Sequence, residues 1–312
     1  MKTNIVKDNI NYTYKTLIKD IEFLKYEFRE IESFKIGEIG KSTLKNRIPY
    51  IKIGEGEKTL FINASHHANE WITSLVCMLF FEKTLNLLRN KEKYKKYNLN
   101  ELLKNTKIII VPMVNPDGVD LVLKEKYIFE KKEYLELIFK NINKLKNWKA
   151  NIRGVDLNLN YPAKWEKAKN IKKKIGIKGP NYRDYVGQNP LSEIETKNMV
   201  AFTNIHQFNM TISLHSQGEE IYYDDLKGVI KKSYEIGKKF ESVSGYKLTK
   251  PEKDSSYAGY KDWYVDNFFK PGYTIEVGKG TSGEPLPIAQ AKEILEKIEE
   301  IFLISLEECI NI

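Results

Sequence analysis

The amino-acid sequence predicts a single-domain α/β sandwich, in which helices flank a mixed, mostly parallel central β-sheet. Short apolar runs typical of buried strands alternate with longer segments of helical periodicity. The run Lys107–Val114 is continuously apolar, as in a central strand that is covered on both faces. No internal repeat or linker divides the 312 residues, so we expect one domain, 1–312.

In the first half of the chain, residues 12–32 repeat apolar side chains at near-helical spacing. We expect them to form an N-terminal helical extension, 1–33, on a core of residues 34–312. The composition of Asn115–Gly118, Asn-Pro-Asp-Gly, indicates a turn. We also expect a two-stranded hairpin, Phe34–Ile39 with Ile48–Ile53. It is followed by a short apolar strand, Thr59–Ala64, and a buried helix, Trp71–Leu88.

The second half continues this alternation, and a long irregular stretch, 151–189, interrupts it. A loop of that length in a compact domain is usually functional. A helix should start near Leu191, with Ser192 as N-cap and Glu195 at the capping-box position. The remaining expected elements are helix 130–147, strand 210–214, helix 226–244, strand 272–277 and helix 288–309.

Composition excludes several classes of protein. The chain is 30% charged and 41% hydrophobic, as in globular proteins. Its net charge of +9 raises the question of nucleic acid, but the lysines are interleaved with other residues, including glutamates. Only Lys164–Lys178 is densely basic, and it lacks a recognition-helix or aromatic stacking pattern, so we expect a solvated surface and no nucleic-acid partner. Such a field also favours acidic substrates.

Cysteine content and targeting signals give further expectations. Cys77 and Cys309 are too few for a disulfide framework or a Cys-type zinc site. Met1–Asp8 has no apolar core of a secretory signal, which predicts a cytoplasmic protein, with spore or cell-wall association as the alternative. We also expect no membrane partner, because no run approaches a transmembrane span. The sequence does not predict the oligomeric state.

Two predicted strands end in histidine-containing segments. His67 and Glu70 lie between strand Thr59–Ala64 and the following helix, three residues apart, so both side chains can face one point. His215 directly follows the strand of residues 210–214. Open α/β sheets carry their sites at such carboxyl ends. Two histidines and one glutamate are the ligand set of hydrolytic zinc sites, so the sequence predicts one Zn²⁺ per chain.

A zinc hydrolase also needs a general base near the metal. Glu276 is the candidate, because it stands among apolar residues of the last predicted strand and needs a reason to be buried there. An ordinary salt bridge is the alternative explanation for Glu276. His206, at a predicted helix end, is expected to be structural or solvated.

Five motifs occur in the order seen in zinc carboxypeptidases related to carboxypeptidase A, and the chain resembles that family over about residues 34–305. They are His67-x-x-Glu70, Asn115-Pro-Asp-Gly118, Gly154-Val-Asp-Leu-Asn158, Leu214-His215-Ser216 and Thr274-Ile-Glu276. Within the family, the chain resembles the branch of bacterial γ-D-glutamyl-L-diamino acid peptidases, which cut peptidoglycan stem peptides. The segments that carry this likeness are His67–Thr73, Trp148–Asn158, Lys261–Trp263 and Glu284–Pro287.

The resemblance implies a role for each matching residue. The two histidines and Glu70 would ligate zinc. Glu276 would accept the proton of the attacking water and pass it to the leaving amine. Asn158 would lie in the pocket for the substrate carboxylate. His66 is an extra histidine at the surface or behind the ligands.

Three departures from the family pattern bear on the substrate. Leu159 stands where carboxypeptidases have the Arg that clamps a terminal carboxylate. The oxyanion-stabilising Arg is replaced by Lys149, which takes its role unless Arg153 reaches in. The position of the family's mobile-loop Tyr falls on Asp254 in this chain. Either Tyr257 or Tyr260 could serve instead, and the sequence does not decide between them.

The resemblance places Lys261 at the deepest position of the specificity pocket, where a cation would select an acidic leaving residue. An exposed lysine is the alternative. We therefore expect a zinc metallopeptidase acting on a peptide or muropeptide, namely on γ-D-glutamyl-diaminopimelate. The alternatives are a general metallocarboxypeptidase, against which Leu159 argues, a zinc deacylase of N-acyl amino acids, and a non-catalytic binding protein.

Overall fold

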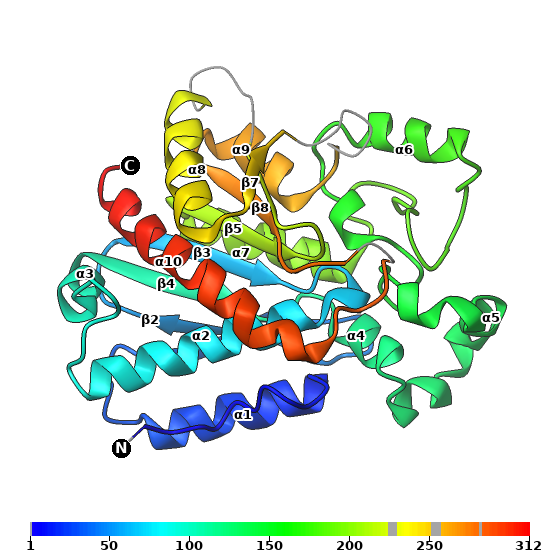
Figure 1. Ribbon diagram of the computed structural model, residues 1–312. Helices are drawn as coiled ribbons and strands as arrows, with labels where there is room; N and C mark the ends of the chain where they lie inside the picture. Colours follow the sequence, from blue (N-terminus) through cyan, green and yellow to red (C-terminus); the bar gives the residue numbers. More distant parts are fainter. Residues whose placement is uncertain (1, 224–229, 251–256, 281–282) are drawn as a thin grey trace.

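A computed structural model describes residues 2–223, 230–250, 257–280 and 283–312. Their strands form one eight-stranded sheet in the order β1-β2-β4-β3-β5-β8-β6-β7 (Figure 1). Four adjacent strands at its centre run parallel. In sheet order they are β4 (Thr106–Val111), β3 (Lys58–Ala64), β5 (Met210–His215) and β8 (Gly272–Glu276).

The outer strands make the sheet mixed. β1 (Lys35–Lys41) and β2 (Arg47–Ile53) form the predicted antiparallel hairpin, and β2 pairs antiparallel with β4. On the other side β6 (Glu220–Tyr222) runs antiparallel to β8, and β7 (Lys247–Thr249) runs parallel to β6. The prediction of a mixed, mostly parallel sheet flanked by helices is therefore confirmed.

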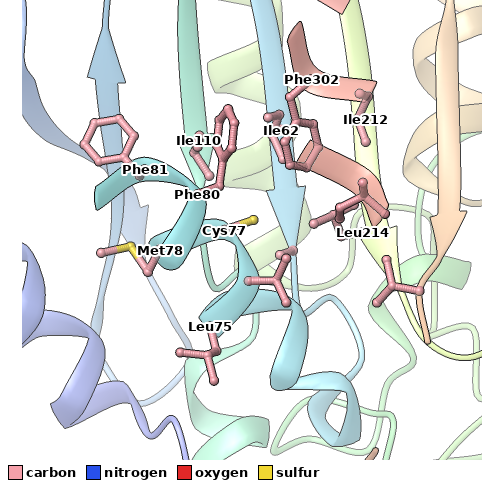
Figure 2. Close-up of a cluster of buried hydrophobic side chains, with 14 of the residues drawn as sticks. Ile62, Leu75, Cys77, Met78, Phe80, Phe81, Ile110, Ile212, Leu214 and Phe302 are labelled. Carbon is pink, nitrogen blue, oxygen red and sulfur yellow. The ribbon is translucent and has the colours of Figure 1, made fainter. Parts of the chain in front are cut away.

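Helices cover both faces because the central strands are apolar on both sides. One face packs under α1 (Tyr14–Glu27), α2 (Ile72–Arg89), α8 (Ile230–Ser244) and α10 (Ala291–Ile310). Figure 2 shows Phe80 of α2 beside Ile110 of the sheet and Phe302 of α10 beside Ile62, all within one buried cluster. The rings of the two phenylalanines meet edge to face with centroids 4.7 Å apart.

The opposite face carries an aromatic layer. Phe61, the β3 residue next to Ile62, points to this side, because successive strand side chains alternate. It stacks on Phe208, with ring centroids 4.2 Å apart, and lies against Phe202 and Tyr260. The covering helices are α7 (Ile194–His206) and α9 (Tyr260–Phe268).

Shorter helices complete the described part of the chain. The α-helices are α3 (Leu99–Asn105), α4 (Pro116–Val122), α5 (Lys132–Lys140) and α6 (Trp165–Lys174). The 3₁₀ turns are η1 (Ala68–Glu70), η2 (Lys126–Glu130), η3 (Ile142–Asn147), η4 (Leu157–Leu159) and η5 (Ile288–Gln290).

Three local predictions were wrong. Asn115–Gly118 is a helix start, because the Asn115 side chain accepts from the backbone N–H of Gly118 at 3.1 Å and Pro116 occupies the first helical turn. The N-cap of α7 is Glu193, whose carboxylate accepts the Ser192 hydroxyl, so no capping box forms there. The stretch 151–189 contains α6 and η4.

The expectation that no segment approaches a transmembrane span was also wrong. The stretch Ala68–Arg89 is long and apolar enough to cross a membrane by length and composition, with a mean hydropathy of 1.3. However, 83% of that window is buried inside the fold. Its apolar character is accounted for by burial against the sheet and α10.

Candidate active site

Three adjacent parallel strands bring the predicted chemical residues together. β3, β5 and β8 lie side by side, with Ala64 paired to Leu214 and His215 paired to Glu276. The residues that follow β3 and those that end β5 and β8 thus meet at the carboxyl ends of these strands. This is the placement that the strand-end argument predicts.

His67, Glu70 and His215 form a buried group whose candidate ligand atoms all lie within 4.8 Å of one another. The Nδ1 of His67 lies 2.8 Å from Glu70 Oε1, and the Nδ1 of His215 lies 3.0 Å from Glu70 Oε2. The two Nδ1 atoms are 3.2 Å apart. Zinc bonds of about 2.0–2.2 Å in a tetrahedron separate ligand atoms by ~3.3 Å, so this donor set fits a zinc ion.

Further contacts orient these side chains from behind. Asp156 Oδ1 lies 3.3 Å from the Nε2 of His67, the atom on the other side of its ring from Glu70. Carboxylates in this position fix the orientation of metal-binding histidines. The backbone N–H of Ser216 donates to Glu70 Oε2 at 3.2 Å. The site therefore has a positioned outer layer as well as three candidate ligands.

The charges of the site are strongly coupled. Burial disfavours the charged form of His67, but the carboxylates of Glu70 and Asp156 together outweigh it and raise the pKa of His67 to about 9. Burial likewise opposes ionisation of Glu70 and Asp156, yet His67 and Lys149 hold the pKa of both carboxyl groups well below the ordinary value. Both carboxylates are thus ionised at neutral pH, Glu70 within the candidate ligand group and Asp156 behind His67.

Glu276 and Lys149 stand beside this group. Burial, followed by the charge of Glu70, raises the pKa of Glu276 to about 8. Lys149 Nζ lies 3.3 Å from Glu70 Oε1, and the carboxylates of Glu70 and Glu276 raise its pKa against the effect of burial. The site therefore pairs a carboxyl group poised near neutral pH with a fixed cation, as acid–base chemistry requires.

A cavity of about 290 Å³ opens onto these groups, close to the smallest volumes usual for ligand pockets. Ionic side chains from several elements line it, together with Asn158, Leu159, Gly259, Tyr222 and Thr274. The ionic and ionisable lining residues are His67, Lys149, Asp156, Lys172, Arg183, Asp184, Lys261, Asp262 and Glu276.

Asn158 and Lys261 line this cavity, as the sequence led us to expect. The Oδ1 of Asn158 accepts from the backbone N–H of Tyr260 at 3.0 Å, which leaves Nδ2 as its donor for a carboxylate. Lys261 is nearly buried, and its Nζ lies 2.8 Å from Asp262 Oδ1. Our expectation of an exposed lysine as the alternative is therefore wrong, and the pocket holds a paired cation and anion.

Other candidates face elsewhere. The Nε of Arg153 lies 3.2 Å from Glu193 Oε2, and the half-exposed side chain does not line the cavity, so Lys149 is the cation beside the candidate ligands. Tyr260 is fully buried, its hydroxyl bonds Thr203 at 2.9 Å, and it does not line the cavity.

Tyr257 and His66 also contact protein groups. The Tyr257 hydroxyl accepts from Lys167 of α6, outside the cavity lining, so the structure does not place Tyr257 against a substrate. Asp254 lies outside the described residues. His66 is buried with its Nε2 2.9 Å from the Tyr161 hydroxyl, behind the candidate ligands and apart from them.

Sequence reasoning missed five charged residues of the cavity, one of which is Asp262, the partner of Lys261. Asp156 could have been found, because it lies inside the quoted motif that ends at Asn158, two residues from that side chain. Lys172, Arg183 and Asp184 come from the 151–189 stretch, where no periodic pattern indicates which side chains turn inward. Only tertiary folding brings them to the site.

Comparisons with known proteins agree with this geometry. A family profile described as zinc carboxypeptidase matches residues 27–302. The γ-D-glutamyl-L-diamino acid endopeptidase 1 of Lysinibacillus sphaericus is 36% identical over 303 residues, which is 97% of this chain and 74% of the relative. The uncharacterized protein YqgT of Bacillus subtilis is 39% identical over 263 residues, 82% of this chain and 68% of that protein.

Solved structures show the same fold. The crystal structure of thrombin-activatable fibrinolysis inhibitor superposes with a TM-score of 0.75 at 20% identity, over 99% of this chain and 80% of that chain. The family profile spans most of the sequence, including all three candidate ligands and Glu276. The chain therefore belongs to the zinc carboxypeptidase family of metallopeptidases.

Proposed function

We propose that the protein binds one Zn²⁺ through His67, Glu70 and His215 and hydrolyses the γ-D-glutamyl-diaminopimelate bond of peptidoglycan stem peptides. The observation that carries the substrate assignment is the Lys261–Asp262 pair in the cavity. The distal end of diaminopimelate is an amino-acid head, with a carboxylate beside an ammonium group. A cation and an anion 2.8 Å apart complement both charges of that head.

Leu159 supports the same assignment. It lines the cavity where a general carboxypeptidase has an arginine, so the described site lacks the usual clamp for a terminal α-carboxylate at that position. The relative from Lysinibacillus sphaericus carries γ-D-glutamyl-L-diamino acid endopeptidase in its name, and the chain covers 74% of it. Both points favour a wall peptide over an ordinary L-peptide.

The side chains divide the chemistry among them. Zinc, when bound, supplies a Lewis acid that acidifies water and polarises the scissile carbonyl. Glu276 accepts the proton of the attacking water and delivers it to the leaving amine, a role suited to its raised pKa. The ammonium of Lys149 stabilises negative charge that develops on the carbonyl oxygen. Asn158 Nδ2 donates to a carboxylate of the leaving residue.

Mass spectrometry of muropeptides after incubation with the purified, zinc-loaded protein tests this proposal. We expect L-Ala-γ-D-Glu-diaminopimelate to release diaminopimelate. The Glu276→Gln variant should keep its zinc and lose activity by several orders of magnitude, about 10³-fold or more, because the proton acceptor is gone. Zinc content measured on the same samples separates lost chemistry from lost metal.

Two substrates serve as comparisons: an L-peptide with an apolar C-terminal residue and an N-acyl amino acid. Faster trimming of the L-peptide would make the protein a general carboxypeptidase. Faster hydrolysis of the N-acyl amino acid would make it a deacylase. Full activity of Glu276→Gln on the muropeptide would remove Glu276 from the mechanism.

A further inference from the structure

Arg183 is a cation of the cavity wall that the proposed function has not used. Its segment is fixed on both sides by backbone hydrogen bonds. The carbonyl of Tyr182 accepts from Lys149 N at 2.8 Å and Ala150 N at 3.0 Å, and the carbonyl of Tyr185 accepts from Asp156 N at 2.8 Å. Arg183 is thus anchored between the residues that follow Trp148 and the carboxylate that contacts His67.

The guanidinium of Arg183 keeps donors available for a ligand. Its Nε lies 3.1 Å from Asp184 Oδ2, and Asp184 is itself held by Lys172 at 2.6 Å. Within the described part of the chain, no acceptor bonds the two terminal nitrogens of Arg183. These nitrogens form the fork that matches a carboxylate, and the side chain is one-third exposed at the cavity.

Arg183 and Lys261 belong to different walls. Lys261 lies on α9 next to Gly259 and Asn158, the wall that would receive the leaving residue. Arg183 lies toward Gly283, where an added Cβ would be 3.7 Å from its Nη1. The carbonyl of Gly283 accepts from Asn69, within the segment of the candidate zinc ligands. The cavity therefore presents cations on two sides.

A γ-linked glutamyl residue has a group that needs such a second cation. Its side-chain carboxyl forms the scissile amide, so its α-carboxylate stays free on the acyl side of that bond. An ordinary peptide has an uncharged amide at the equivalent place. We propose that Arg183 binds the α-carboxylate of the γ-D-glutamyl residue and so makes the enzyme selective for the γ-linkage; this inference rests on the proposed function.

Amidation of a single carboxyl group tests this assignment. The substrates are L-Ala-γ-D-Glu-diaminopimelate and its γ-D-isoglutaminyl counterpart, in which the α-carboxylate is a carboxamide. For the wild type we expect kcat/KM to be about 10–100-fold higher on the acid, the scale of one charge-assisted contact. In the Arg183→Gln variant, kcat/KM on the acid should fall by about 10–100-fold, whereas kcat/KM on the amide should change little.

Binding to the inactive Glu276→Gln protein gives a second measurement. Calorimetry should give a lower Kd for the acid than for the amide with the Glu276→Gln protein. The two Kd values should become similar in the double variant that also carries Arg183→Gln. Arg183→Lys should recover part of the preference, because it restores the charge without the fork. Arg47→Gln is the matched control, since Arg47 also pairs through Nε with a carboxylate, Glu38, on an exposed strand.

The outcomes are distinguishable. If the wild type cleaves neither γ-glutamyl substrate, the proposed function fails and this inference falls with it. If the wild type cleaves both equally, or Arg183→Gln slows both equally, the inference is wrong while the function stands. A third substrate, amidated on diaminopimelate, covers the remaining case. If Arg183→Gln no longer lowers kcat/KM on this substrate, Arg183 binds the carboxylate of the leaving residue instead, and the proposal is overturned.

Discussion

Among single residues, Glu70 connects the two histidines of the site. One of its oxygens faces His67 and the other faces His215, and all three side chains are buried. The pair His67 and Glu70 comes from one short segment, whereas His215 comes from a different strand. A metal ion bound at this group would therefore depend on a histidine from outside the segment that holds His67 and Glu70.

We expect His215→Ala to abolish stoichiometric zinc binding. Two remaining ligands cannot complete the three-ligand set that catalytic zinc needs. Metal analysis after dialysis should give about one zinc per wild-type chain and a small fraction of that in the variant. His206→Ala is the matched control, because His206 is exposed and lies outside the ligand group. Wild-type zinc content in His215→Ala would disprove the ligand assignment.

Lys261 is the residue expected to set the leaving-group preference. In the chain its Nζ is already paired with Asp262 Oδ1 at 2.8 Å, so a substrate carboxylate would share this ammonium group with Asp262. Lys261→Ala should still lower kcat/KM on the diaminopimelate substrate by about 10–100-fold, since it removes one charge-assisted contact. The rate on an L-peptide with an apolar end should not fall. Unchanged kinetics on both substrates would place Lys261 outside substrate recognition.

The sequence could predict the centre of this site and not its margins. His67, Glu70, His215 and Glu276 stand at strand ends, where local patterns and the topology of parallel strands place them together. Arg183 had no such signal, because its approach depends on how a long loop folds back onto the sheet. For a residue in a loop, the residue type alone does not indicate which other residues it contacts.

Among the elements, burial decided which ones could be predicted. β3 and β5 are apolar and buried along nearly their whole length, so their sequences were diagnostic. In contrast, α6 is lysine-rich and buries only Trp165 and Ala168, which left its helical pattern hidden in a charged stretch. The last two strands of the sheet, β6 and β7, have three residues each, too few for a period to be read.

The first turn of α7 contains a carboxyl group that should make stability depend on pH. Glu195 is fully buried and accepts the backbone N–H of Thr43 at 2.8 Å, and burial, followed by the charge of Asp117, raises the pKa of Glu195 from 4.5 to about 7. Its folded pKa exceeds the unfolded value, so its protonated form stabilises the fold below about pH 4.5 and that contribution is lost as pH rises through 7.

Glu195→Gln stays neutral and should escape this loss. Relative to the variant, the wild type should lose up to about 3 kcal/mol of unfolding free energy between pH 4.5 and pH 8. Urea unfolding of both proteins at the two pH values measures the difference. If the two proteins show parallel pH dependence, Glu195 does not titrate in this window.

On the scale of the whole molecule, the N-terminal segment is part of the main core. Glu82 of α2 accepts the backbone N–H groups of Ile5 and Val6 at 2.7 and 3.0 Å. Five large side chains from this segment are almost completely buried against the body of the fold: Tyr12, Leu17, Ile21, Leu24 and Phe28.

Deletion of residues 1–33 should therefore unfold the protein. Burial of each large apolar side chain contributes about 1.5–3 kcal/mol, so five of them approach the whole stability of a typical domain, about 5–15 kcal/mol. Circular dichroism should show no cooperative melting of the truncated chain. Phe23→Ala, on the half-exposed side of α1, is the control and should melt like the wild type. A truncated chain that melts cooperatively near the wild-type temperature would make residues 1–33 dispensable.

The placement of the candidate ligands on separate strands also affects how the chain folds. In an unfolded chain His67 and Glu70 stay neighbours, but His215 is 145 residues away from Glu70. An ion held by all three therefore binds only after β3 and β5 have paired, and its affinity adds to the stability of that pairing. At a free concentration a thousandfold above Kd this amounts to about 4 kcal/mol. Zinc supply would then set the stability of the folded enzyme as well as its activity, and a chelator would destabilise the fold.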